Sequence, residues 1–117
     1  MTLEEINAVT LSVTDMARSF AFYTKLGFRV EYGGPDASFT SFRVGVQFLN
    51  LDLTPGYKAA QNWGRTIFHV SGVDAIYRRA LDAGLTPEMP PSDASWGERY
   101  FHILDPDGHE LSFAKRL

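Results

Sequence analysis

Few side chains of this sequence could carry out acid–base chemistry. The carboxylates of Asp52, Glu98 and Glu110 fall in segments with strand-like patterns, and two of them would have to meet in space to act as a general acid and base. The sequence contains no Ser-His-Asp order, nucleophile elbow, phosphate-binding loop or dinucleotide fingerprint. It has no cysteine, which excludes disulfides, thiolate metal sites and cysteine nucleophiles. Acid–base catalysis would therefore require two of these carboxylates to lie close together, and their spacing in the sequence does not decide whether they do.

Two tryptophans, Trp63 and Trp96, flank loops rather than lie within alternating strands. Each one either offers a stacking surface to a planar ligand or plugs the end of a sheet or a dimer interface. Among the histidines, we expect His102 to be a satisfied polar group in a hairpin and His109, next to a turn glycine, to be solvated.

The composition limits the class of protein and the kinds of molecule that it can bind. The chain has 117 residues, which suits a single domain, and 44% of them are hydrophobic, so a core can form. Its net charge of −3 argues against nucleic acid and favours a cationic or neutral ligand. The first seven residues do not resemble a signal peptide, and no apolar run is long enough to span a membrane. We expect a cytoplasmic protein with no membrane partner.

The elements that must position these side chains occur in two similar series. In the first, residues 6–13 alternate as a strand, Thr14 and Asp15 offer helix N-cap oxygens, and Gly27 suits the end of that helix. Three strands follow, at residues 28–32, 39–44 and 46–53. In the second series, a strand over residues 65–70 precedes a helix that ends at Gly84. The remaining predictions are strands at 85–89, 98–104 and 109–115, a loop at 90–95 and a hairpin turn at 105–108.

The two series are a repeat with an offset of 57 residues, which places Val13 on Val70 and Gly27 on Gly84. We predict a single α+β domain over residues 1–117, made of module 1 (6–53), a linker (54–64) and module 2 (65–115). Each module has the order βαβββ. One helix covers one face of each sheet, so we expect the curved mixed sheet to surround a cleft, with the helices on its convex side.

Two segments carry a family resemblance. The segment from Val13 to Tyr23, followed by Leu26-Gly27-Phe28, resembles the first strand–helix signature of the vicinal-oxygen-chelate superfamily, which contains glyoxalase I, extradiol dioxygenases and bleomycin-resistance proteins. Asp105-Pro106-Asp107-Gly108-His109-Glu110-Leu111 is similar to the last hairpin of that family. The resemblance covers nearly the whole chain and implies the glyoxalase/bleomycin resistance fold.

Enzymes of this family hold one divalent metal with four side chains. The resemblance places those positions on Ala8, Asn50, Arg65 and Ser112. Alanine has no donor atom, arginine is a permanent cation, and the other two are weak ligands. We therefore predict that the protein carries no stoichiometric transition metal and no other cofactor. His69, His102 and Glu110 are the alternative set for a relocated metal site.

A family member without these metal ligands is similar to the bleomycin-resistance branch, in which a drug is bound in a metal-free cleft. The segment from Trp96 to Phe101 resembles the tryptophan-glycine segment of that branch. The resemblance implies a homodimer. The predicted ligand-binding residues are those expected to face the cleft: Phe48, Asn50, Asp52, Trp63, Arg65, Ile67, His69, Trp96, Tyr100, His102, Glu110 and Ser112. Arg65 either holds an anionic group of a ligand or pairs with Asp52 or Glu110, and Phe48 either walls the pocket or packs in the core.

Three classes of function remain open. The first is a binding protein for a small organic molecule, with drug or toxin sequestration as its role. The second is an enzyme, either a lyase, isomerase, dioxygenase or thiol transferase, with a relocated metal or none. The third is an accessory module without an open pocket.

Overall fold

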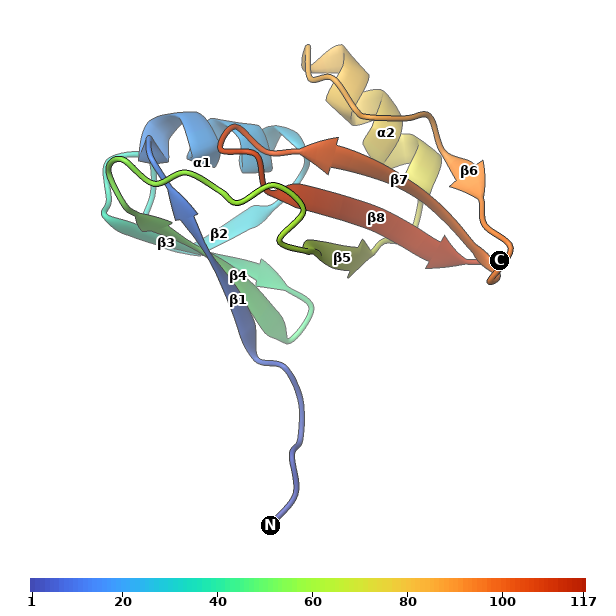
Figure 1. Cartoon of the computed structure of the whole chain (residues 1–117), viewed down its shortest axis with the longest axis horizontal. Coiled ribbons are helices and arrows are strands. Elements are labelled where there is room, and N and C mark those ends of the chain that lie inside the picture. Colours follow the sequence, from blue (N-terminus) through green and yellow to red (C-terminus); the bar gives the residue numbers. More distant parts are fainter. The chain divides into compact units, whose positions relative to one another are not determined.

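The element order βαβββ occurs twice in the computed structural model, which describes residues 1–117 (Figure 1). The first series comprises β1 (Ala8–Val13), α1 (Met16–Lys25), β2 (Arg29–Tyr32), β3 (Phe39–Val44) and β4 (Gln47–Leu53). The second comprises β5 (Arg65–His69), α2 (Val73–Asp82), β6 (Ser92–Asp93), β7 (Glu98–Leu104) and β8 (Glu110–Arg116). The two series fall in two compact units, Met1–Tyr57 and Lys58–Leu117. Neither helix has the length and apolar character needed to cross a membrane.

Each unit contains one four-stranded mixed sheet. The strand orders are β1-β4-β3-β2 and β5-β8-β7-β6. In each sheet the first strand of the unit runs parallel to the last one, and the other neighbours are antiparallel. The parallel pairing is possible because the helix and two strands between the partners provide the long crossover that parallel strands need.

The predicted repeat is confirmed through the helices. β1 and β5 begin 57 positions apart, and so do α1 and α2. Asp15 caps α1 by accepting a hydrogen bond from the Arg18 backbone N–H at 3.1 Å. Gly27 and Gly84 follow the two helices with φ angles of 100° and 78°, a left-handed conformation that glycine adopts without strain. The two helices therefore end in the same way, whereas α2 begins at Gly72 without a side-chain cap.

The predicted strand over residues 85–89 is wrong. The short strand β6 lies at Ser92–Asp93 instead, inside the segment predicted as a loop. Pro87, Pro90 and Pro91 explain the difference, because proline has no N–H to donate to a ladder. The segment keeps one backbone hydrogen bond to β7, from the Glu88 N–H to the His102 carbonyl at 2.9 Å. β8 begins 28 positions after α2 ends, whereas β4 begins 22 positions after α1 ends, so the repeat loses its constant offset here.

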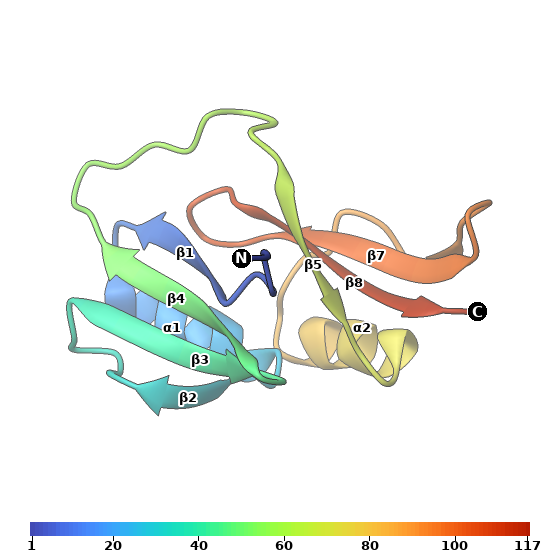
Figure 2. The ribbon, with the colours of Figure 1, turned by 90° about the horizontal axis from the view of Figure 1, so that it is seen from below.

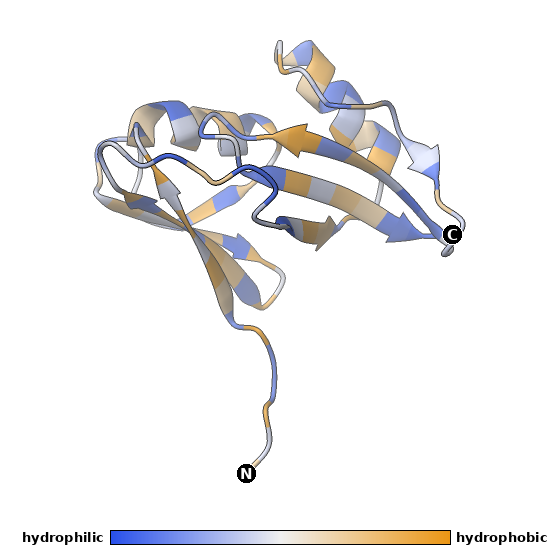
Figure 3. Cartoon of the chain, in the orientation of Figure 1, coloured by the Kyte–Doolittle hydropathy of each residue, from blue (hydrophilic) through white to orange (hydrophobic).

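Each helix covers one face of its own sheet (Figure 2). In the first unit, Phe20 of α1 stacks on Phe42 of β3, with ring centroids 5.9 Å apart. In the second, Tyr77 of α2 meets the edge of Phe101 of β7 at 5.4 Å, and Phe101 stacks on Phe113 of β8. Apolar and polar residues alternate along these strands (Figure 3), so the face turned away from each helix is rich in polar side chains.

Candidate functional site

The sheet of the second unit has an open face, by which we mean the face turned away from α2. Strand alternation defines it, because Phe68, Phe101 and Phe113 are buried against the helix side and their neighbours point the other way. Its side chains come from three adjacent strands and are Arg65, Ile67, His69, Glu98, Tyr100, His102, Glu110 and Ser112. Seven of these eight, all except Glu98, were predicted as ligand-binding residues. Ser112 lies beneath its neighbours, with 3% of its surface exposed.

Four charged or titratable side chains form a row across this face, which we call the carboxylate row: Arg65, Glu110, His102 and Glu88. The Arg65 Nε donates to Glu110 Oε1 at 2.6 Å, which confirms one of the two predicted partners of Arg65. The other oxygen of Glu110 lies 4.0 Å from His102 Nδ1. Glu88 hydrogen-bonds to Glu110, so two carboxyl groups touch within the row. The pairing is possible because Glu110 and His102 are diagonal neighbours on β8 and β7.

The side chains of the carboxylate row shift one another's pKa values in different directions. Partial burial, followed by the hydrogen bond and the like charge of Glu110, raises the pKa of Glu88. Burial alone would also raise the pKa of Glu110, but hydrogen bonds from Arg65 and Glu88 outweigh it and lower that pKa. Burial and the nearby Arg65 guanidinium lower the pKa of His102. The row therefore favours an ionised Glu110 and a neutral imidazole.

An aromatic series continues from the carboxylate row. The ring of Tyr100 lies 5.1 Å from that of His102 and 5.6 Å from that of Trp96. The Trp96 indole N–H donates to Glu98 Oε1 at 3.0 Å, and the other oxygen of Glu98 contacts His69 Nε2 at 2.9 Å. This hydrogen bond fixes the orientation of Trp96. The residue is 67% exposed, so much of its ring surface remains in contact with solvent.

Trp63 has a different environment. Its indole N–H donates to His109 Nδ1 at 3.2 Å, and the two rings meet edge to face. The prediction that His109 is solvated is wrong, because only 2% of its surface is exposed. The Trp63 indole lies against the His109 ring, and the Asp105 carboxylate fixes the β7–β8 turn by accepting from the His109 backbone N–H at 2.9 Å. Of the two predicted roles of Trp63, these contacts favour packing.

In the first unit, Phe48, Asn50 and Asp52 share the sheet face turned away from α1, as predicted. The Arg43 guanidinium lies 5.0 Å above the Phe48 ring, and Asn50 donates to Thr10 Oγ1 at 3.2 Å. The predicted site residues thus form two groups, one on each sheet.

The four positions implied to bind a metal do not fit one. Ala8 offers no ligand atom, and Asn50, whose Nδ2 donates to Thr10, offers only a neutral amide oxygen. Arg65 contributes a fixed positive charge bound to Glu110, and Ser112 is buried. The alternative set of three is also rearranged: His69 contacts Glu98, while His102 and Glu110 are joined by Glu88. Sequence patterns missed Glu88 because it lies in the proline-rich segment, where no periodicity predicts the direction of a side chain.

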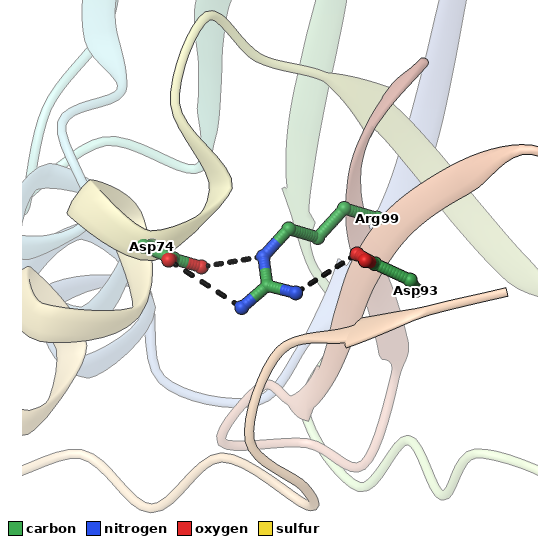
Figure 4. Close-up of polar contacts among 3 residues, drawn as sticks. All are labelled: Asp74, Asp93 and Arg99. Carbon is green, nitrogen blue, oxygen red and sulfur yellow. Dashed lines mark hydrogen bonds and ion pairs between the residues drawn. The ribbon is translucent and has the colours of Figure 1, made fainter. Parts of the chain in front are cut away.

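A pocket of about 250 Å³ lies away from the open face, at the start of α2. Arg99 forms part of its wall and joins two elements, donating to Asp74 of α2 at 2.9 Å and to Asp93 of β6 at 2.8 Å (Figure 4). These two carboxylates raise the pKa of Arg99, chiefly through the hydrogen bond that Arg99 donates to Asp74. None of its lining residues was predicted as a site residue. No sequence pattern indicates that Arg99 would join the start of α2 to β6.

Comparisons with known proteins agree with this architecture. A model of the Glyoxalase/Bleomycin resistance protein/Dioxygenase superfamily matches residues 5–113. An uncharacterized protein of Mycobacterium bovis is 32% identical, over 90% of this chain and 79% of that protein. TioX from Micromonospora sp. ML1 has a similar structure, with a TM-score of 0.78 at 25% identity over 97% of this chain and all of that one.

A bleomycin-binding protein, solved in complex with bleomycin, has a TM-score of 0.77 at 22% identity, over 98% of this chain and 100% of that chain. At that identity the similarity is one of fold. The predicted α+β fold of two βαβββ modules is confirmed as the glyoxalase/bleomycin resistance fold. The chain belongs to the Glyoxalase/Bleomycin resistance protein/Dioxygenase superfamily.

Proposed function

We propose that the protein binds a small organic molecule with a planar ring on the open face of its second sheet, and does so without a metal at the four family positions. The observation that carries this proposal is Trp96. A large aromatic side chain with 67% of its surface in water costs free energy unless something covers it. Its hydrogen bond to Glu98 holds the ring in place, so a ligand that stacks on it loses little side-chain entropy.

The neighbours of Trp96 add the polar contacts that give a site its specificity. Tyr100 extends the aromatic surface, and the carboxylate row lies next to it. The excess of acidic over basic side chains in the row, together with the net charge of −3, favours a neutral or cationic ligand.

Sequestration is the role that fits this face best. Its charged groups are already paired, Arg65 with Glu110 and His69 with Glu98. Such pairing stabilises a binding surface but holds the groups away from a substrate. A protein of the same fold binds bleomycin, which makes bleomycin the first ligand to test.

Thermal denaturation with and without ligand tests the proposal. Bleomycin and a panel of planar aromatic compounds would be added to the wild type, to Trp96→Ala and to Leu81→Ala. Leu81 is a matched control, because it is a 47% exposed apolar side chain on α2. A ligand at one hundred times its Kd stabilises by about 2.7 kcal/mol. We expect this gain in the wild type and in Leu81→Ala and its loss in Trp96→Ala. Equal gains in all three proteins would contradict the proposal.

We also propose a homodimer. Ile67 leaves a large apolar surface in solvent on the open face, with 57% exposed, and this surface suits burial against a second chain. Sedimentation equilibrium at micromolar concentration should give twice the chain mass of 13.1 kDa, and a species of 13.1 kDa would contradict a dimer.

A further inference from the structure

We propose that Glu88, His102 and Glu110 form a binding site for one divalent cation of the zinc type. This site uses three side chains of the carboxylate row, next to the proposed ligand-binding surface at Trp96. It differs from the four family positions implied by the resemblance. The donor atoms of the three side chains lie within 4.8 Å of one another.

Three separate elements bring these donors together. Glu110 opens β8, and His102 lies diagonally across from it on β7. Glu88 reaches the same point because its backbone N–H is hydrogen-bonded to the His102 carbonyl at 2.9 Å, on the side of β7 away from β8. The imidazole of His102 and the two carboxyl groups therefore converge on one place.

The ligand set matches zinc chemistry. Catalytic and other open zinc sites use three protein ligands, drawn from imidazole and carboxylate groups, at about 2.0–2.2 Å from the metal. Donors bound at that distance lie roughly 3–3.5 Å apart, so the present separations need only a small contraction. Glu88 is an exposed side chain and can rotate to supply it.

Charge also favours a cation. The row contains two carboxyl groups and one permanent cation, Arg65. Arg65 binds the Oε1 atom of Glu110 and leaves Oε2 directed toward His102. An arginine in this place orients the ligand carboxylate from behind, as outer partners of metal ligands do. A bound cation would displace the proton that Glu88 and Glu110 share in their hydrogen bond, and it would neutralise the carboxylate charge that Arg65 leaves uncompensated.

The open face contains its own control. His69 and Glu98 have the same residue types and a contact of 2.9 Å, but the second oxygen of Glu98 accepts the Trp96 indole N–H. A third carboxylate or imidazole is not part of this pair. If zinc bound to any exposed histidine–glutamate pair, the two places would bind it equally.

Isothermal titration of tag-free, chelator-treated protein with Zn²⁺ tests the site. We expect one Zn²⁺ per chain in the wild type, with an affinity reduced at least thirtyfold in His102→Gln and Glu88→Gln. The His69→Gln control should stay within threefold of the wild type. Mg²⁺, which imidazole binds poorly, should bind at least tenfold more weakly than Zn²⁺.

Three results would overturn the proposal: no Zn²⁺ binding by the wild type, a loss in His69→Gln as large as that in His102→Gln, or binding by Glu88→Gln as tight as that of the wild type. Circular dichroism would verify that each variant is folded, and Glu88→Gln retains an amide that can still donate to Glu110. Trp96→Ala should bind zinc like the wild type. Failure of zinc binding would leave the Trp96-dependent stabilisation by organic ligands intact, so the two proposals fail separately.

Discussion

Replacing Trp63 by phenylalanine removes one indole N–H and keeps an aromatic ring at the same place. The lost hydrogen bond is the one to His109 Nδ1, 3.2 Å long. His109 is 2% exposed, so water cannot readily replace the donor, whereas the Trp63 ring is 44% exposed and loses less packing. The variant therefore isolates one polar contact that ties the segment before β5 to the β7–β8 turn.

The expected cost follows from the burial of the acceptor. A buried polar group left without its partner costs about 1–3 kcal/mol, so we expect the free energy of unfolding to fall by about 2 kcal/mol. With an unfolding entropy of about 2.1 cal/mol/K per residue, that loss lowers the Tm by roughly 8 °C.

Urea and thermal unfolding would be followed by far-UV circular dichroism, because the substitution itself changes tryptophan fluorescence. Trp96→Phe is the matched control: it removes the same type of N–H from a solvent-exposed bond to Glu98. We expect this control to change the free energy of unfolding by no more than about 0.5 kcal/mol. Equal effects of the two substitutions, or no effect of Trp63→Phe, would refute the reasoning from burial.

Other substitutions test the core, the carboxylate row and the edge of the second sheet. Phe101→Ala empties a fully buried position between Tyr77 and Phe113 and should cost about 3–5 kcal/mol in urea unfolding, whereas a cost below 1 kcal/mol would contradict the packing. The pKa of His102 is lowered in the folded chain, so the unfolded chain binds more protons below pH about 6.5 and stability falls as the pH drops through that range. The free energy of unfolding of the wild type should therefore fall relative to that of His102→Gln from pH 7 to pH 5, and a constant difference would argue against this reasoning. Arg99→Gln should speed amide exchange in β6, because it breaks the ion pairs to Asp74 and Asp93, and unchanged exchange would show that those pairs do not hold the strand.

Much of the fold could be predicted because its local signals agree. Alternation predicted that Arg65, Ile67 and His69 share one face of their strand, and the structure has the same arrangement. The glycines after both helices and the Asp105–Gly108 turn each have a direct physical cause in backbone conformation. The segment after α2 was mispredicted because Leu85 and Met89 suggested a strand, while the prolines between and after them removed the donors that a strand needs.

The site was predictable only in part, for a similar reason. The alternation of side chains along a strand predicted that Tyr100, His102 and Glu110 lie on one face. It does not predict which side chains of neighbouring strands contact one another. The pairing of Arg65 with Glu110 and of His69 with Glu98 depends on the register of β5, β8 and β7. The burial of His109 depends on a contact between residues 46 positions apart, which no local pattern reports.

The central claim, that ligands bind on the open face beside Trp96, has a direct test in the two tryptophans of the chain. A ¹H–¹⁵N correlation spectrum should contain two indole N–H signals, one from Trp96 in solvent and one from Trp63 at the buried His109. During titration with bleomycin or a planar aromatic compound that binds, the Trp96 signal should shift together with the amides of β7, while the Trp63 signal stays in place. Shifts confined to Trp63, or to the pocket at the start of α2, would contradict the claim.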